Sequence, residues 1–293
     1  MSAKRVSQPV NVDPKKFVNI CQRNISTVSN RLDDYITSQD EKNIHDIQTS
    51  VRRLDACYKT LPKKLHKKKQ IKKFVNKSKK LFNINSQVRD FDVITELVKR
   101  NNPKDESGNR VDFKNFENRR SLKLEKAKAV AVGLRKLPVP NVKKNSVPTA
   151  KLNKRFNKLI NKFGSRIQLN LPSVMTDSDK VAELHEMRKD CDKLQYLLEL
   201  VPHGNSSHTN LSQLEEELQN MQDLLGAIYD HDATAAYLKR QKKHQRRNDI
   251  VENILQERKK RYENFLIHCK SDITNNNHSL LLGIARRDRT SID

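Results

Sequence analysis

Tryptophan is absent from this sequence of 293 residues, and aromatic residues of all kinds make up only 5% of it. Glycine is also scarce, with 6 residues, which argues against an all-β fold with many tight turns. No stretch approaches the roughly 20 apolar residues that span a bilayer, and residues 1–12 lack the apolar core of a secretory signal. We therefore expect a protein of the cytoplasm that is not anchored in a membrane.

The four cysteines are far apart and form no Cys-x-x-Cys pair, whereas a structural zinc site needs closely spaced ligands. Because each lies in a helix-like apolar pattern, we interpret all four as small core residues, with metal ligation as the less favoured alternative: Cys21, Cys57, Cys191 and Cys269. The sequence also lacks a Gly-rich phosphate loop, a Gly-x-Ser-x-Gly motif and a His-Glu-x-x-His motif. We expect a protein with no catalytic residues, no metal and no cofactor.

Positive charge is the property that the sequence has in excess. There are 59 Lys and Arg against 35 Asp and Glu, which gives a formal net charge of +24. So many cations repel one another in a compact fold, and a polyanionic partner would relieve that repulsion. Nucleic acid, an anionic membrane surface and an inorganic polyanion all fit, and composition does not choose among them.

Helical periodicity dominates, and no strand-like alternation is evident. Asp13 and Pro14 resemble an N-cap and a first helical residue, and apolar residues follow at steps of three and four up to Ile36. A second stripe runs from Ile44 and stops at Pro62. The pattern predicts an all-α fold with further helices at 63–82, 89–102, 112–137, 149–167, 178–200, 209–225, 230–245 and 248–269.

Several landmarks repeat when the sequence is shifted by 140 residues. Ile44-His45-Asp46 falls on Leu184-His185-Glu186, and Asp90-x-Asp92 falls on Asp230-x-Asp232. The offset predicts an internal duplication that produces two pseudo-symmetric helical bundles of about four helices each. The expected organisation is a flexible N-terminus at 1–12, a first half at 13–137, a Pro-rich connector at 138–148, a second half at 149–270 and an unassigned tail at 271–293.

Cations at helical spacing are the main candidates for a binding site. His45, Arg52 and Lys59 are seven residues apart each time, so they form one row on a helix, with Arg53 beside them. The second half offers His185 and Arg188 one turn apart, with Lys193 nearby. Such a row suits a long anion with repeated charges. The alternative is an exposed helix face of solvated cations.

Two further patterns invite a functional interpretation. Residues 63–80 contain ten lysines and no acidic residue, yet keep an apolar stripe, as expected for a helix with a strongly basic face. The pairs Asp90/Asp92 and Asp230/Asp232 could be metal-binding or acid–base carboxylates, but no strand is evident to support such a site. We interpret these four aspartates as structural residues that cap helices and pair with buried cations.

The marked positions resemble the CHAD family, the conserved histidine α-helical domain. In the first half the similarity lies in His45, Arg52-Arg53-Leu54 and Arg89-Asp90-Phe91-Asp92-Val93. In the second half it lies in three segments: Leu184-His185-Glu186-Met187-Arg188, Lys193-Leu194-Gln195-Tyr196, and Leu225-Gly226 followed by Asp230-His231-Asp232. The paired spacing covers roughly residues 13 to 245.

This resemblance implies two pseudo-symmetric helical bundles that bind inorganic polyphosphate along a basic surface or central channel where the halves meet. It carries a set of expected polyanion contacts onto this sequence: His45, Arg52, Arg53, Arg89, His185, Arg188 and Lys193, to which the row on the second helix adds Lys59. Acidic or neutral residues replace the family's cations at four positions: Gln48, Asp55, Asp192 and Gln195. Either the ligand has changed, or part of the binding has moved to the lysine-rich segment, where the candidates are Lys67, Lys68, Lys72 and Lys73.

We therefore expect non-catalytic binding of inorganic polyphosphate, with polyphosphate granules as a candidate location. Nucleic-acid binding through the phosphate backbone is the alternative, although the basic clusters at 63–80 and 239–247 contain only one aromatic residue for stacking, Phe74. A third possibility is an enzyme that acts on phosphoanhydrides, for which the four aspartates are the only support. A membrane-surface role is weakest, because the basic helices lack a broad apolar face. The sequence does not indicate the oligomeric state.

Overall fold

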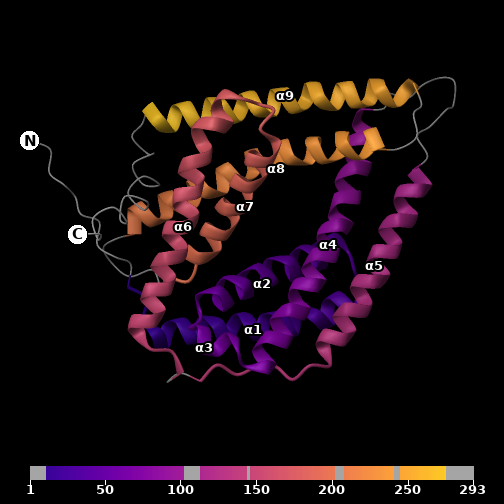
Figure 1. The fold of residues 1–293 in the computed structure, drawn as a ribbon. Helices are drawn as coiled ribbons and strands as arrows, with labels where there is room; N and C mark the ends of the chain where they lie inside the picture. Colours follow the sequence, from indigo (N-terminus) through magenta and orange to yellow (C-terminus); the bar gives the residue numbers. More distant parts are fainter. Residues whose placement is uncertain (1–10, 102–112, 144–145, 202–207, 241–244, 275–293) are drawn as a thin grey trace, which may run out of the picture.

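The computed structural model describes residues 11–101, 113–143, 146–201, 208–240 and 245–274. This part of the chain contains nine α-helices and no strand, which confirms the all-α prediction (Figure 1). The helices are α1 (Pro14–Thr37), α2 (Glu41–Thr60), α3 (Lys63–His66), α4 (Lys69–Asn101), α5 (Phe113–Arg135), α6 (Thr149–Thr176), α7 (Val181–Leu198), α8 (His208–Arg240) and α9 (Gln245–Thr274). Most of the predicted N-terminal segment and C-terminal tail lies outside the described residues.

Local sequence signals account for the first two helices. The side chain of Asp13 accepts a hydrogen bond from the backbone N–H of Lys16 at 2.8 Å, and Pro14 follows it as the first helical residue. Asp40 caps α2 in the same way through the N–H of Asn43 at 2.7 Å. Both helices bury their apolar stripes in the shared core, so capping and periodicity together determine where they form.

The helices form two sets that follow each other along the chain. In the first set α1 packs on α2 and α5, and α4 packs on α2 and α5; in the second, α6, α7, α8 and α9 pack in sequence, each on the next. The sets meet through α2 against α7 and α4 against α8 (Figure 1). One large hydrophobic cluster draws on both sets, so the two halves share a core.

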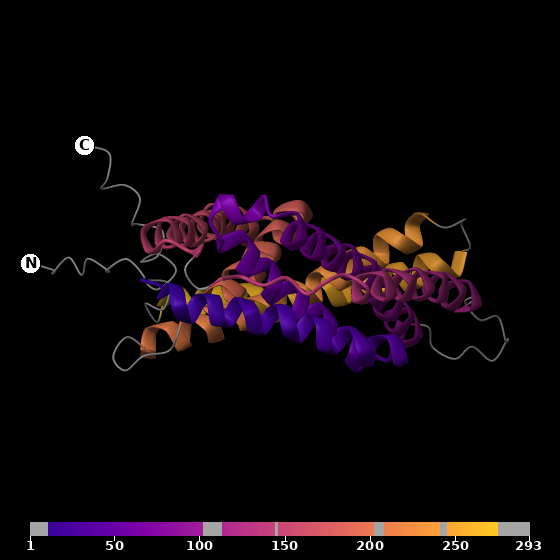
Figure 2. The same cartoon turned by 90° about the horizontal axis from the view of Figure 1, so that it is seen from below.

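The connector between α5 and α6 lies across one side of the molecule, against α1 (Figure 2). Gln22 on α1 holds it on both sides: its side-chain nitrogen donates to the carbonyl of Pro140 at 3.3 Å, and its oxygen accepts from the N–H of Val142 at 3.2 Å. Pro140, Val142 and Val147 are buried. The connector is therefore part of the packed structure.

Two of the predicted helix breaks are wrong. Helix α4 continues through residues 83–88, because Asn85 is accommodated in the core, where its side chain accepts a hydrogen bond from the Tyr35 hydroxyl at 2.7 Å. Helix α8 likewise continues through Gly226, a residue that weakens a helix without ending it. The break in the lysine-rich segment falls instead between α3 and α4.

Candidate functional site

The cations predicted on the second helix all lie on α2, but each has its own surroundings. His45 is exposed, and its ring lies 3.5 Å from the hydroxyl of Thr49. Arg52 and Lys59, two and four turns further along, are half-buried. The predicted row therefore exists on the helix, while its members contact different neighbours.

Arg52 lies where α2 meets α4 and α7. Its guanidinium is 3.4 Å from a carboxylate oxygen of Asp192, a residue of the other half. The same guanidinium lies 5.3 Å from the ring centre of Phe82 and 6.0 Å from that of Tyr196, distances at which cation–π attraction contributes. These contacts hold the arginine at the junction of the two halves, with an acid already beside it.

The other two cations on α2 are also paired with acids. Arg53 donates through Nε to Glu199 on the opposite half at 2.7 Å, and that carboxylate raises the pKa of Arg53. Lys59 and Lys79 both contact Asp55, at 2.6 and 2.5 Å. An anionic ligand would have to compete with these carboxylates.

In the second half, His185 and Arg188 share one aromatic partner, Tyr229. The imidazole of His185 stacks on the tyrosine ring at 4.5 Å between centroids, and the guanidinium of Arg188 lies 4.7 Å from the ring centre. Burial, followed by the charges of Lys189 and Arg188, lowers the pKa of His185. The histidine is therefore neutral at pH 7 and adds no positive charge to the site.

Lys193 faces a different neighbour from the other predicted contacts. Its ammonium is 2.9 Å from Asp190, whose side chain is fully buried, and 5.3 Å from the ring centre of Phe163 on α6. Arg166 reaches the same carboxylate at 2.9 Å. Lys193 is thus turned towards α6 and neutralises a buried acid.

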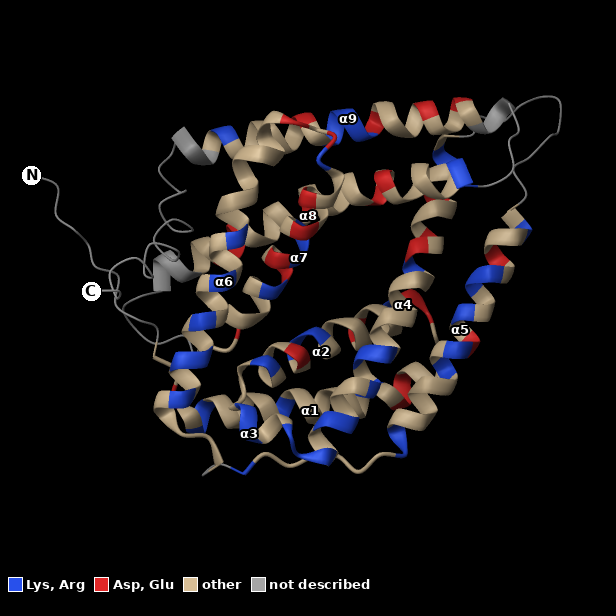
Figure 3. Ribbon diagram, viewed as in Figure 1, with Lys and Arg blue, Asp and Glu red and all other residues tan. Residues whose placement is uncertain are grey.

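Two aspartates at equivalent positions of the halves, Asp90 on α4 and Asp230 on α8, complete the junction. Burial raises the pKa of Asp90, and the nearby carboxylate of Asp230 raises it further. Burial also raises the pKa of Asp230, while Arg188 and Arg89 oppose that shift. We call the residues gathered here the central cluster: Arg52, Arg89, Asp90, Arg188, Asp192 and Asp230. It contains equal numbers of arginines and aspartates, and Figure 3 shows both charges where α2, α4, α7 and α8 meet.

The prediction that the two Asp-x-Asp segments cap helices is wrong, because both lie inside long helices, α4 and α8. The second aspartate of each segment instead pairs with an arginine of the next helix. Asp92 accepts from Nε of Arg120 on α5, and Asp232 accepts from Nε of Arg258 on α9 at 2.9 Å. These carboxylates therefore join neighbouring helices.

The lysine-rich segment lies apart from the central cluster. Lys67 and Lys68 connect α3 to α4, Lys72 and Lys73 lie in the first turns of α4, and all four are exposed. These residues belong to the end of the molecule near α3 in Figure 3. The structure thus separates the predicted contacts into a charge-balanced junction and an exposed basic surface.

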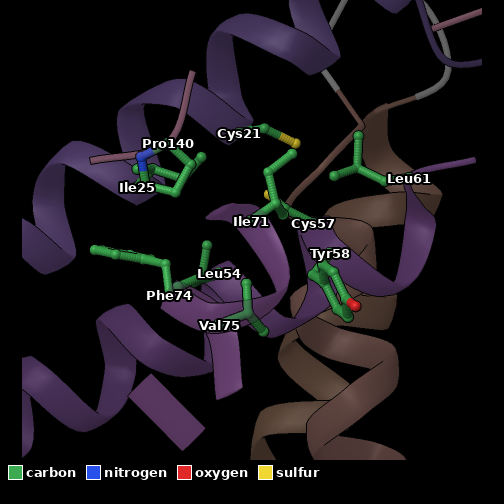
Figure 4. Close-up of a pocket in the computed structure, with 10 residues that line it drawn as sticks. All are labelled: Cys21, Ile25, Leu54, Cys57, Tyr58, Leu61, Ile71, Phe74, Val75 and Pro140. Carbon is green, nitrogen blue, oxygen red and sulfur yellow. The ribbon is translucent and has the colours of Figure 1, made fainter. Parts of the chain in front are cut away.

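The enclosed cavity between α1, α2 and α4 is not a site for an anion. Figure 4 shows that apolar side chains, the Cys21 and Cys57 thiols and Tyr58 line it, and that Pro140 of the connector reaches it. Among the described residues, no group of three or more His, Cys, Asp or Glu side chains could hold a metal ion. Within the same residues, no helix is long and apolar enough to cross a membrane.

Sequence reasoning missed several of the acids that neutralise the predicted site. Glu199 lies 146 residues from Arg53, and no periodic pattern connects the two. Asp190 carried a usable signal, since it lies one turn before Lys193 and among the buried residues of α7. Arg120 and Arg258 have no motif of their own, although they occupy comparable places in the two halves.

The comparisons with known proteins agree with this architecture. The CHAD domain family matches residues 19–239, and no curated protein matches the sequence. Among solved structures, the crystal structure of the CHAD domain from the plant Ricinus communis is similar, with 14% sequence identity, a TM-score of 0.49, and coverage of 96% of this chain and 94% of that chain. Because the family match spans well over half of the sequence, this protein belongs to the CHAD domain family.

Proposed function

We propose that this protein binds inorganic polyphosphate without catalysing a reaction on it. The observation that supports this best is the convergence of arginines on one junction: Arg52, Arg89 and Arg188 lie far apart in the sequence and come together in the central cluster. Arginine offers fork geometry that suits phosphate oxygens. A flexible and densely charged chain of phosphates needs such cations and no groups that recognise a base.

We further propose that the two halves arose by duplication. A shift of 140 residues places the bounds of α1, α2 and α4 close to those of α6, α7 and α8. It also relates Arg52 to Asp192 and Asp90 to Asp230, and each of these pairs faces itself across the junction. Equivalent residues meet in this way only near a twofold axis, which supports a pseudo-symmetric arrangement.

The charge balance of the junction sets the terms of binding there. A phosphate that enters the central cluster has to replace Asp192 beside Arg52 and approach the carboxylates of Asp90 and Asp230. Repulsion by these aspartates offsets much of the attraction of the arginines. The net charge of +24 must therefore act from elsewhere on the molecule.

The function is tested by titrating the protein with long-chain polyphosphate at several salt concentrations, with duplex DNA as competitor. We expect saturable binding that weakens steeply with salt and that DNA displaces only at large excess. Preference for DNA would favour the nucleic-acid alternative. Release of orthophosphate on addition of Mg²⁺ would contradict a non-catalytic role.

A further inference from the structure

The net charge of this protein is confined to two parts of the sequence. Residues 56–89 and residues 126–176 each contain 12 Lys and Arg and no Asp or Glu. The remaining residues contain 35 Lys and Arg and 35 Asp and Glu, so their formal charges cancel. Two segments that belong to different halves of the fold therefore carry the whole excess of +24.

The fold brings these two segments into contact. Arg155 on α6 donates through Nε to the backbone carbonyl of Lys59, and its terminal nitrogen lies 3.5 Å from the imidazole of His66 on α3. On the other side of α4, the ammonium of Lys77 occupies the place that a Cβ at Gly133 of α5 would take. Pro140 of the connector closes the cavity beneath α4 (Figure 4). The acid-free segments are thus neighbours across α2, α3, α4, α5 and α6.

Their cations face solvent at one end of the molecule, seen at the bottom of Figure 3 around α3, the connector and the adjoining ends of α5 and α6. We call this surface the basic end and define it by its exposed side chains: Lys63, Lys64, Lys67, Lys68, Lys69, Lys72, Lys73, Lys126, Lys128, Arg135, Lys136, Lys143, Lys151, Lys154 and Lys158. Acids reach its borders at Asp33, which pairs with Arg135, and at Asp55. The basic end contrasts with the central cluster, where cations and acids are equal in number.

We propose that the basic end is the main binding surface for a long polyphosphate chain, and that the ligand bridges the two halves by contacting α3 and α4 on one side and α6 on the other. This proposal rests on the proposed function. Cations repeat along α6 at steps of three and four residues, about 5–6 Å apart, which suits a ligand with closely repeated charges. Exposed lysines bind phosphate as point charges and need not give up a carboxylate partner first.

The same surface is poorly suited to single-stranded nucleic acid. Within the two acid-free segments, Phe74, Phe156 and Phe163 are buried, Phe82 is half-buried, and Tyr58 is half-buried and stacked on His66 at 4.3 Å. No exposed aromatic ring is therefore available among the described residues of the basic end for stacking on a base. Recognition there rests on phosphate charge alone.

Three variants of the full chain test this proposal. The basic-end variant is K67Q/K68Q/K151Q/K154Q, which removes four charges from α3, α4 and α6. A matched control, K239Q/R240Q/K259Q/K260Q, removes four exposed charges from α8 and α9. The central variant is R52Q/R188Q. Binding of long-chain polyphosphate is measured across a salt series, with circular dichroism and thermal melts to show that each variant is folded.

We expect the basic-end variant to lose at least about tenfold in affinity and to show a shallower salt dependence, because fewer counterions are released on binding. The control and the central variant should change much less. Equal losses in the basic-end variant and the control would overturn the proposal in favour of diffuse attraction, and a loss confined to the central variant would place the ligand at the junction. Tighter binding of duplex DNA than of polyphosphate would assign the surface to another ligand. Failure of the wild-type protein to bind polyphosphate would instead refute the proposed function.

Discussion

Asp90, Asp192 and Asp230 hold carboxylates where burial works against their charge. Burial is the largest cause of the raised pKa of each of them, and for Asp90 the carboxylate of Asp230 adds to it. A carboxyl group whose pKa is raised by folding stabilises the fold at pH values below its unfolded pKa. That contribution is lost as the pH rises through the folded pKa. The junction is therefore less stable at neutral pH than in mild acid.

We predict that Asp90→Asn increases the free energy of unfolding at pH 7, because it removes both a buried charge and its repulsion with Asp230. The advantage over the wild type should shrink as the pH falls towards 4, where the wild-type carboxyl becomes protonated. Urea unfolding at several pH values measures this. A variant whose advantage grew on acidification would contradict the assignment.

Two similar ion pairs join neighbouring helices but differ in burial. Arg258 and Asp232 have side chains only 8% and 15% exposed, whereas Arg120 and Asp92 are 32% and 43% exposed. Arg258 also donates to the carbonyl of Ser178 at 2.6 Å. We predict that Arg258→Ala lowers the free energy of unfolding by about 3–5 kcal/mol, since it leaves a carboxylate buried without its partner.

The matched control, Arg120→Ala, should cost about 1 kcal/mol or less, because water can solvate the exposed partner. Denaturant unfolding of both variants tests the comparison. Equal losses would show that burial does not distinguish the two pairs.

At the scale of the helix, α4 and α8 are the elements that connect the halves. Each spans 33 residues, and they contact each other as well as α5 and α9. Continuity of α4 depends on a polar residue in the core, Asn85, which hydrogen-bonds to Tyr35 of α1. Burial also raises the pKa of Tyr35 to about 12, so the hydroxyl keeps its proton and donates it to Asn85.

We predict that Tyr35→Phe lowers the free energy of unfolding by about 1–3 kcal/mol, because the buried oxygen of Asn85 loses its donor. The double variant Tyr35→Phe/Asn85→Leu should recover much of that loss by removing both polar groups. A thermal or urea melt compares the two. If the double variant were no better than the single one, packing rather than hydrogen bonding would explain the effect.

The helix breaks that were predicted at 83–88 and 226–229 show the limit of periodicity as a guide to element length. Polar residues and a glycine interrupted the apolar stripes, and such interruptions commonly mark the end of a helix. In this fold each long helix changes partner along its length: α4 packs on α2 and α5 and also on α8 and α9. The buried face therefore rotates, and no single stripe persists over 33 residues.

At the scale of the molecule, charge is distributed in a way that should link binding to stability. The cations of the basic end repel one another, and a bound polyanion would relieve that repulsion. We predict that long-chain polyphosphate raises the melting temperature, with stabilisation of about 2.7 kcal/mol at a ligand concentration 100 times the Kd. Orthophosphate at the same total phosphate and ionic strength is the control. An equal rise with orthophosphate would show that single phosphates suffice.

The sequence by itself determined the all-α fold, the first two helices with their Asp caps, and the family to which the chain belongs. These features are encoded locally, in apolar spacing, capping residues and short motifs, so they can be read without knowing which segments meet.

Only the tertiary structure decided which charges remain available. Arg52 meets Asp192 and Arg53 meets Glu199 across more than 130 residues of sequence, whereas lysines from α3, α4 and α6 share one exposed end. Whether a cation is neutralised depends on the acid that packing places within a few ångströms of it, because Coulomb attraction is governed by distance and burial. Sequence separation does not enter that relation, which is why the motif identified the arginines but not their partners.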